Sequence, residues 1–86
     1  MTTYERQLLK EAEFINAKQA SDGVLFCVTR KGRCYPGKYS VFKVKIRNGQ
    51  ITSEYHLYSY QAKPVVIHMR DLFLKIHNLE ITNANN

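Results

Sequence analysis

The sequence has no acidic residue between Gly23 and Ser53, although this stretch makes up about a third of the chain. Seven of the thirteen Lys and Arg residues fall in the same stretch. These cations are Arg30, Lys31, Arg33, Lys38, Lys43, Lys45 and Arg47. A block of one charge sign creates a positive field, which attracts phosphate groups or an acidic protein surface. The charge pattern therefore predicts a class of partner, but it names no reaction.

Cysteines and long apolar runs are also scarce. Cys27 and Cys34 are too few for a disulfide framework, and we expect reduced thiols in a cytoplasmic protein rather than a bridge across a hairpin. The longest apolar run, residues 65–69, is interrupted by His68 and is too short to span a bilayer. The first residues lack the apolar core of a signal peptide. We therefore expect no membrane partner.

The remaining composition is that of an ordinary small globular domain. The chain has 86 residues, 44% of them hydrophobic, and a formal net charge of +6. This length allows one core with one or two helices against a sheet. We expect a single α+β domain over residues 1–82 and a flexible tail over residues 83–86.

The first expected element is a helix over residues 3–20. Thr2 and Glu5 have the spacing of a capping box, in which each side chain satisfies a backbone N–H of the other residue. Ser21, Asp22 and Gly23 then break the helix. Its expected buried stripe is Tyr4, Leu8, Ala12 and Ile15.

Three strands are expected next, over residues 24–30, 38–47 and 50–60. Each is rich in β-branched or aromatic residues, and turn-forming residues separate them. Asn48 and Gly49 lie between two alternating runs, which is a strong hairpin signal because a type I′ turn needs positive φ at both central residues. The last two strands are therefore predicted to form a hairpin.

A two-residue turn also predicts which residues of the hairpin face each other. Arg47 then lies opposite Gln50, and Lys43 lies opposite Glu54. The predicted core face holds Phe42, Val44, Ile46, Ile51, Tyr55 and Leu57. The predicted water-facing side holds Tyr39, Val41, Lys43, Lys45, Arg47, Thr52, Glu54, His56, Tyr58 and Tyr60.

The last expected element is a helix over residues 64–79, beginning with a proline at its first position. We expect Val65, Met69, Leu72, Ile76 and Leu79 to be buried, flanked by Val66 and Phe73. The predicted order is α-β-β-β-α, a three-stranded antiparallel sheet with two helices packed on one face. This order resembles that of the double-stranded RNA-binding domain in topology. That family has a lysine-rich motif where this chain has Gln61-Ala62-Lys63-Pro64, so the sequence does not predict membership.

The predicted water-facing side combines cations with aromatic rings, which are the two requirements of single-stranded nucleic acid binding. A solvated sheet face, with Lys43 simply paired to Glu54, explains the same residues. We expect a non-enzymatic nucleic-acid-binding accessory protein for single strands or duplexes. The expected contact residues are Arg30, Lys31, Arg33, Lys38, Tyr39, Lys43, Lys45, Arg47, His56 and Tyr58.

The alternative hypothesis is a protein-interaction module or inhibitor that binds an acidic or apolar partner surface. It depends on apolar residues that the predicted fold leaves outside the core, namely Phe14, Ile67, Leu74 and Ile81. A homodimer through the last helix also accounts for an apolar stripe there. Burial of these residues by loops or the chain end is the simplest explanation of the same pattern.

Catalytic and metal-binding patterns are weak. His56, His68 and His77, with the two cysteines, have no zinc-finger spacing, so we expect no metal. A ribonuclease with His56 as base and Tyr58 beside it is the catalytic alternative to simple binding. Because no paired carboxylates or nucleophile motif occurs, we expect no catalytic residues and no cofactor.

Overall fold

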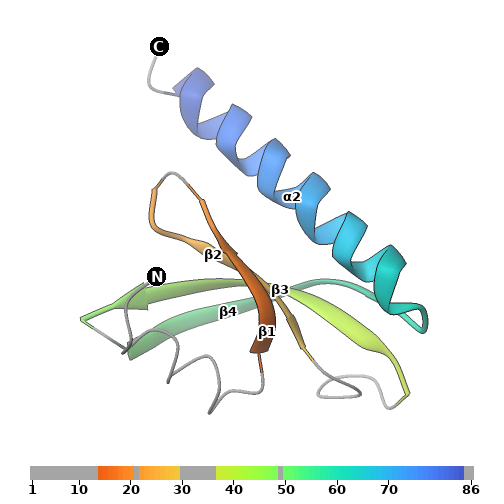
Figure 1. The fold of residues 1–86 in the computed structure, drawn as a ribbon. Coiled ribbons are helices and arrows are strands. Elements are labelled where there is room, and N and C mark those ends of the chain that lie inside the picture. Colours follow the sequence, from red (N-terminus) through yellow and green to blue (C-terminus); the bar gives the residue numbers. More distant parts are fainter. Residues whose placement is uncertain (1–13, 21, 30–36, 49, 85–86) are drawn as a thin grey trace.

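The computed structural model describes residues 14–20, 22–29, 37–48 and 50–84. Over these residues one four-stranded antiparallel sheet is crossed on one face by one helix (Figure 1). The elements are β1 (Phe14–Gln19), β2 (Leu25–Thr29), β3 (Tyr39–Arg47), β4 (Gln50–Tyr60) and α2 (Lys63–Ala84), and the strands lie side by side in chain order. The α+β class is confirmed. The expected three-stranded sheet with two helices is wrong for the described part of the chain.

Strand β1 replaces the last part of the predicted N-terminal helix. Phe14 lies opposite Thr29 of β2, and its ring lies 5.6 Å from that of Phe42. Only 4% of Phe14 is exposed, which corrects its predicted place outside the core. Pairing with β2 satisfies backbone groups along that strand, and this outweighs the helix propensity of Ala17 and Lys18. The earlier residues of the predicted helix lie outside the described ranges.

A bulge in β1 is held by the helix. The register between β1 and β2 shifts between Ile15 and Lys18, and Asn16 has a φ of +47°. The buried guanidinium of Arg70 in α2 donates a hydrogen bond to the Asn16 carbonyl and others, of 2.7 and 3.0 Å, to Asp71 Oδ1. Lys18 Nζ lies 3.4 Å from the same carboxylate oxygen. This polar contact, called the Arg70 clamp below, joins β1 to α2.

The predicted hairpin is confirmed. Strands β3 and β4 occupy the expected segments, and Arg47 lies opposite Gln50 as predicted. Asn48 has a φ of +52°, which the short side chain of asparagine tolerates and a type I′ turn requires. Gly49 lies outside the described residues. Beyond Ile51 the predicted register is wrong, because β4 contains two extra residues.

The two extra residues are Thr52 and Leu57. Lys45 lies opposite Ser53 whereas Ile46 lies opposite Ile51, so Thr52 has no partner in β3. In the same way, Leu57 falls between the partners of Val41 and Phe42. A single extra residue moves the following side chains to the other face of the sheet, and a second one restores the original alternation. The residues that exchanged faces are therefore those between the two bulges, together with Leu57, which packs on the same side as Phe26 and Val41.

The core occupies both faces of the sheet. All five residues of β2 are at most 2% exposed, so this strand is buried on each side. The face that α2 covers, called the helix side, holds Phe26, Val28 and Val41 in contact with residues of α2. The opposite face, called the far side, holds a separate cluster of Phe14, Leu25, Cys27, Phe42 and Val44.

The predicted last helix is confirmed as α2, and it extends to Ala84, into the segment expected to be a tail. Its predicted orientation is wrong. Val66 is fully buried against Val28 and Val41, whereas the predicted buried stripe includes the four exposed residues Val65, Leu72, Ile76 and Leu79.

The residues predicted to face outward from α2 lie on its inner part. Ile67, Leu74 and Ile81 are half-buried, and Ile67 and Leu74 pack against the core. The side of α2 that faces the sheet and the side that faces away are both apolar, so hydrophobicity alone does not show which of them is buried. The hydrogen bonds of Arg70 require the row that contains Val66 and Phe73 to face the sheet.

Candidate nucleic-acid interface

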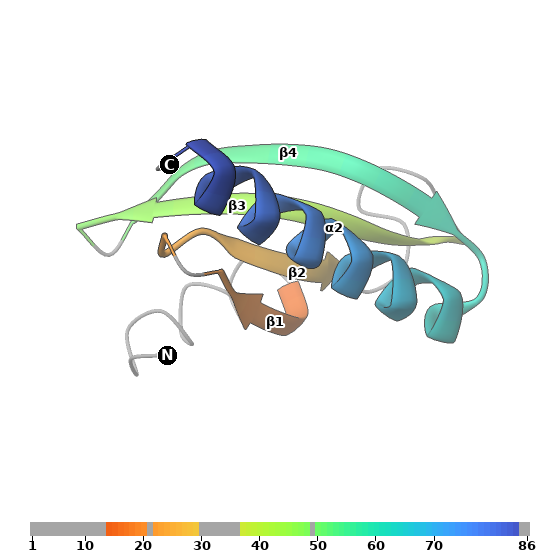
Figure 2. The ribbon, with the colours of Figure 1, turned by 90° about the horizontal axis from the view of Figure 1, so that it is seen from above.

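Most of the predicted binding face is the helix side. Tyr39 and Tyr58 are half-buried and pack around Val41 and Val66. In Figure 2, which looks down on this face, α2 lies across the sheet. The expectation that these rings face water is therefore wrong, because the apolar Val28 and Val41 on this side provide the surface on which the helix packs. Both rings are therefore partly covered, and less of each is open to a base than was expected.

Lys43 also lies at the border of the helix. It is half-buried and lines a hollow of about 180 Å³ whose other walls include Phe73, Ile76 and Glu80 of α2. Its partner in β4 is Tyr55, not the predicted Glu54. Lys43 is therefore partly enclosed by the helix, and we leave it out of the open surface described below.

His56 lies on the far side of the sheet, away from the predicted cations. It is paired with Phe42, and the two rings are 5.4 Å apart. Its Nε2 atom lies 2.6 Å from the hydroxyl of Ser59, which in turn lies 2.7 Å from the hydroxyl of Ser40. The structure therefore does not bring His56 together with Tyr58 and Lys45, as both the binding and the ribonuclease hypotheses required.

An open basic and aromatic surface remains on the helix side near the end of the hairpin. Lys45 and Arg47 are exposed, and Tyr55 is 48% exposed. The Lys45 ammonium nitrogen lies 6.0 Å from the centre of the Tyr55 ring, at the outer limit of a cation–π contact. We call Lys45, Arg47 and Tyr55 the hairpin patch. In Figure 1 the C-terminal end of α2 rises away from the β3–β4 hairpin.

The bulge at Thr52 keeps a negative charge off the face that carries the hairpin patch. In a regular hairpin Glu54 would share a face with Lys45, and Tyr55 would lie on the other side of the sheet. With one extra residue, Glu54 pairs with Val44 on the far side and Tyr55 pairs with Lys43 on the helix side. The bulge therefore exchanges a carboxylate for an aromatic ring beside the cations.

A groove runs beside the hairpin patch, with a volume of about 330 Å³. Lys45 and Arg47 line one wall, and the turn between β1 and β2 lines the other, including Asp22. The Asp22 carboxylate lies 3.0 Å from His77 Nε2 and accepts a hydrogen bond of 3.2 Å from the Val24 N–H. Partial burial raises the pKa of Asp22, but these contacts outweigh it, and the net pKa is lowered. Among the described residues that line this groove, Asp22 is the one acid, and it is already engaged by α2 and by its own turn.

The other predicted cations do not join the hairpin patch. Lys38 is exposed but precedes β3, whereas Arg47 is the last of that strand's nine residues, so the two lie about 30 Å apart. Arg30, Lys31 and Arg33 lie outside the described residues, and their role stays a prediction. Two of the predicted cations are therefore brought together in the open, and both come from the last residues of β3.

Sequence analysis missed Tyr55, which it assigned to the core. The signal that was present is the polar run Thr52-Ser53-Glu54, which interrupts the alternation of β4. Such an interruption is typical of a bulge, because an extra residue is needed to return apolar side chains to a buried face.

The described residues offer little catalytic chemistry. No group of three or more His, Cys, Asp or Glu side chains with the geometry to hold a metal occurs among them. Cys27 is fully buried on the far side, and burial raises the pKa of its thiol to about 12. A thiol in this environment stays protonated and is a poor nucleophile.

Within the described residues, no helix has the length and apolar character needed to cross a membrane. Comparison with protein-family models gives no match, and comparisons with curated proteins and with solved structures give none either. The functional assignment therefore depends on the residues of the hairpin patch.

Proposed function

We propose that this protein is a small, non-enzymatic nucleic-acid-binding protein that contacts single strands through the hairpin patch. The observation that carries the proposal is the exposed Tyr55 ring near the exposed Lys45, with the exposed Arg47 two residues farther along the same face of β3. The net charge of +6, concentrated in an acid-free stretch, adds a long-range attraction for phosphate.

Each residue of the hairpin patch has a separate role in this proposal. Lys45 and Arg47 contact phosphates and release counterions, which supplies sequence-independent affinity. Tyr55 provides a flat surface on which one base stacks, a contact worth about 1 to 3 kcal/mol in other single-strand binders. A base in a duplex is already stacked on both sides, so the ring favours single strands.

The proposal is tested by fluorescence anisotropy with labelled single-stranded and duplex oligonucleotides of the same sequence, starting at low salt. With two phosphate contacts, the logarithm of the single-strand affinity should fall with the logarithm of salt concentration with a slope of about −1.4. Tyr55→Ala should weaken single-strand binding more than duplex binding. Tyr55→Phe keeps the ring and should bind nearly as well as the wild type.

Two charge variants provide the matched comparison. Arg47→Ala removes a cation of the hairpin patch, whereas Lys63→Ala removes an exposed cation at the start of α2. Arg47→Ala should weaken binding and make the salt slope shallower, and Lys63→Ala should have a smaller effect on both. Absence of binding at low salt, or equal effects of the two variants, would reject the hairpin patch as the binding site.

The competing function is a regulator or inhibitor that binds an acidic protein surface with the same cations. That function depends on Lys45 and Arg47 but does not need an aromatic ring for stacking. Binding to oligonucleotides that is lost in Arg47→Ala but unchanged in Tyr55→Ala would contradict the stacking role and favour a purely electrostatic partner.

A further inference from the structure

The outer surface of α2 carries a continuous apolar row that the fold does not bury. Val65 and Leu72 are each 39% exposed, Ile76 is 51% exposed and Leu79 is 55% exposed. The half-buried Met69 lies between the first two. We call Val65, Met69, Leu72, Ile76 and Leu79 the outer ridge. Large apolar side chains gathered in this way are typical of an interaction surface.

The spacing of the outer ridge identifies the kind of surface that fits it. Its residues are separated alternately by four and three positions, a period of 3.5, which is the repeat of a two-helix coiled coil. Val65, Leu72 and Leu79 take the d positions, and Met69 and Ile76 take the a positions. The next a position is Asn83, a polar residue of the kind that selects a two-stranded, in-register pair.

The charged residues beside the outer ridge favour a parallel pairing with a second copy. In this heptad Lys75 occupies a g position and Glu80 the e position five residues later. In a parallel two-stranded coiled coil, each g residue lies beside the e residue five positions later on the other helix. Two identical helices therefore form two Lys75–Glu80 pairs. An antiparallel pair would instead place Lys75 beside other g residues.

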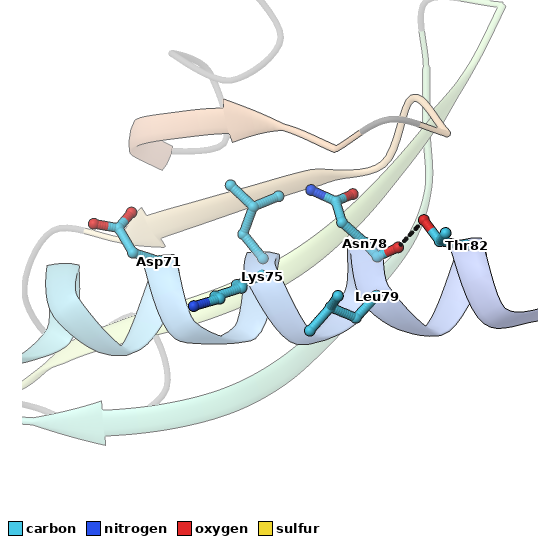
Figure 3. Close-up of a pocket in the computed structure, with 6 residues that line it drawn as sticks. Asp71, Lys75, Asn78, Leu79 and Thr82 are labelled. Carbon is cyan, nitrogen blue, oxygen red and sulfur yellow. Dashed lines mark hydrogen bonds between the residues drawn. The ribbon is translucent and has the colours of Figure 1, made fainter.

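The outer ridge borders the sheet but is not covered by it. The row that faces the sheet contains Val66, Arg70 and Phe73, and it lies on a different side of the helix from the outer ridge. Figure 3 shows Asp71 and Asn78 on the side of α2 toward β1, whereas Lys75 and Leu79 lie on another side. These residues, with Leu74 and Thr82, line a shallow hollow of about 360 Å³ on the helix. Met69 packs partly against Val28 and Val41, and Ile76 borders the hollow beside Lys43, but at least 39% of Val65, Leu72, Ile76 and Leu79 stays exposed.

We propose that the outer ridge binds a second copy of this chain, forming a parallel, two-fold homodimer through α2. The two sheets then lie on opposite sides of the paired helices, and each hairpin patch stays open. The proposal is independent of the nucleic-acid-binding function. The seam covers fewer than three heptads, so we expect reversible association with a Kd in the range of about 1 to 100 µM.

The first test is sedimentation equilibrium of the wild type over concentrations from about 1 to 500 µM. The apparent mass should rise from that of one chain toward that of two. Leu72→Glu and Ile76→Glu each place a charge in the seam and should weaken association at least tenfold. Gln61→Glu adds the same charge at an exposed position before α2 and should leave association unchanged. Circular dichroism should show that all three variants keep the wild-type fold.

The second test addresses orientation with a charge exchange. Lys75→Glu and Glu80→Lys should each weaken self-association, because each places like charges side by side at the g and e positions. A mixture of the two variants should form heterodimers more tightly than either forms homodimers. A mixture without this preference would overturn the parallel arrangement.

Two other outcomes would overturn the dimer itself. One is a monomer at every concentration, which would leave the outer ridge to another partner, such as an amphipathic helix of a different protein. The other is a dimer that persists in both Leu72→Glu and Ile76→Glu, which would place the contact on another surface.

Discussion

The two ends of the β3–β4 hairpin have similar residues on the helix side but different surroundings. At one end Tyr39, Val41 and Tyr58 lie beneath α2 and form part of the core. At the other end Lys45 and Tyr55 are exposed, because the helix rises away from the strands (Figure 1). Alternation along a strand therefore shows which side chains share a face. Whether that face is core or binding surface depends on where the helix lies above it.

The largest expected difference between the two ends is in the effect of replacing an aromatic residue by alanine. Phe26→Ala should lower the free energy of unfolding by about 3 to 5 kcal/mol, because Phe26 is 2% exposed and packs beneath Phe73 and Leu74. Tyr55→Ala should change it by less than about 0.5 kcal/mol, because the ring is half exposed. Urea denaturation measures both values. A similar loss of stability in the two variants would mean that the hairpin end is covered as well.

A second prediction concerns the Arg70 clamp, which fixes α2 over the covered end. Arg70→Met keeps much of the side-chain volume but removes the hydrogen bonds to Asn16 and Asp71, and should cost about 1.5 to 3 kcal/mol. Lys18→Met is the matched control, since Lys18 and Asp71 are both about half exposed and their ion pair is worth less than about 1 kcal/mol. The measurement is again urea denaturation. Equal effects of the two substitutions would show that burial of the guanidinium contributes nothing.

The smallest predicted effect is the pH dependence of stability. Partial burial raises the pKa of Asp71, but hydrogen bonds and charges from Arg70 and Lys18 outweigh it, and the net pKa is lowered. The pKa of Asp22 is also lowered. A carboxyl group whose pKa is lower in the folded state stabilises the fold above its unfolded pKa, and this contribution is lost as the pH falls through the folded pKa.

The free energy of unfolding should therefore stay level down to about pH 5 and decrease below about pH 4. Urea denaturation at a series of pH values measures this change. Asp71→Asn should show a shallower decrease than the wild type over the same range. An identical decrease in the variant would mean that other groups control the acid response.

Much of the fold was predictable because its signals are local. Alternating apolar residues predicted β3 and β4, the Asn48-Gly49 turn predicted their pairing, and periodicity predicted α2. In each case the residues that carry the signal are neighbours in the chain. The predicted register was correct only as far as Ile51, where the turn still determines it.

The features that were not predictable depend on contacts between distant residues. Phe14–Gln19 is a strand because β2 lies beside it and Phe42 receives the Phe14 ring. The side of α2 that faces the sheet is determined by the hydrogen bond from Arg70 to Asn16, which lies 54 residues earlier in the sequence. The predicted binding face failed for the same reason, since no local pattern shows where a helix will pack.

The bulge in β1 has a further consequence, for solubility. Among the described strands β1 is an outer one, and an outer strand offers unpaired backbone groups to any other extended chain. Asn16 has a positive φ, and its carbonyl oxygen accepts a hydrogen bond from the Arg70 side chain. An incoming strand therefore meets an irregular edge with one acceptor already taken, which opposes the edge-to-edge stacking that begins fibril growth.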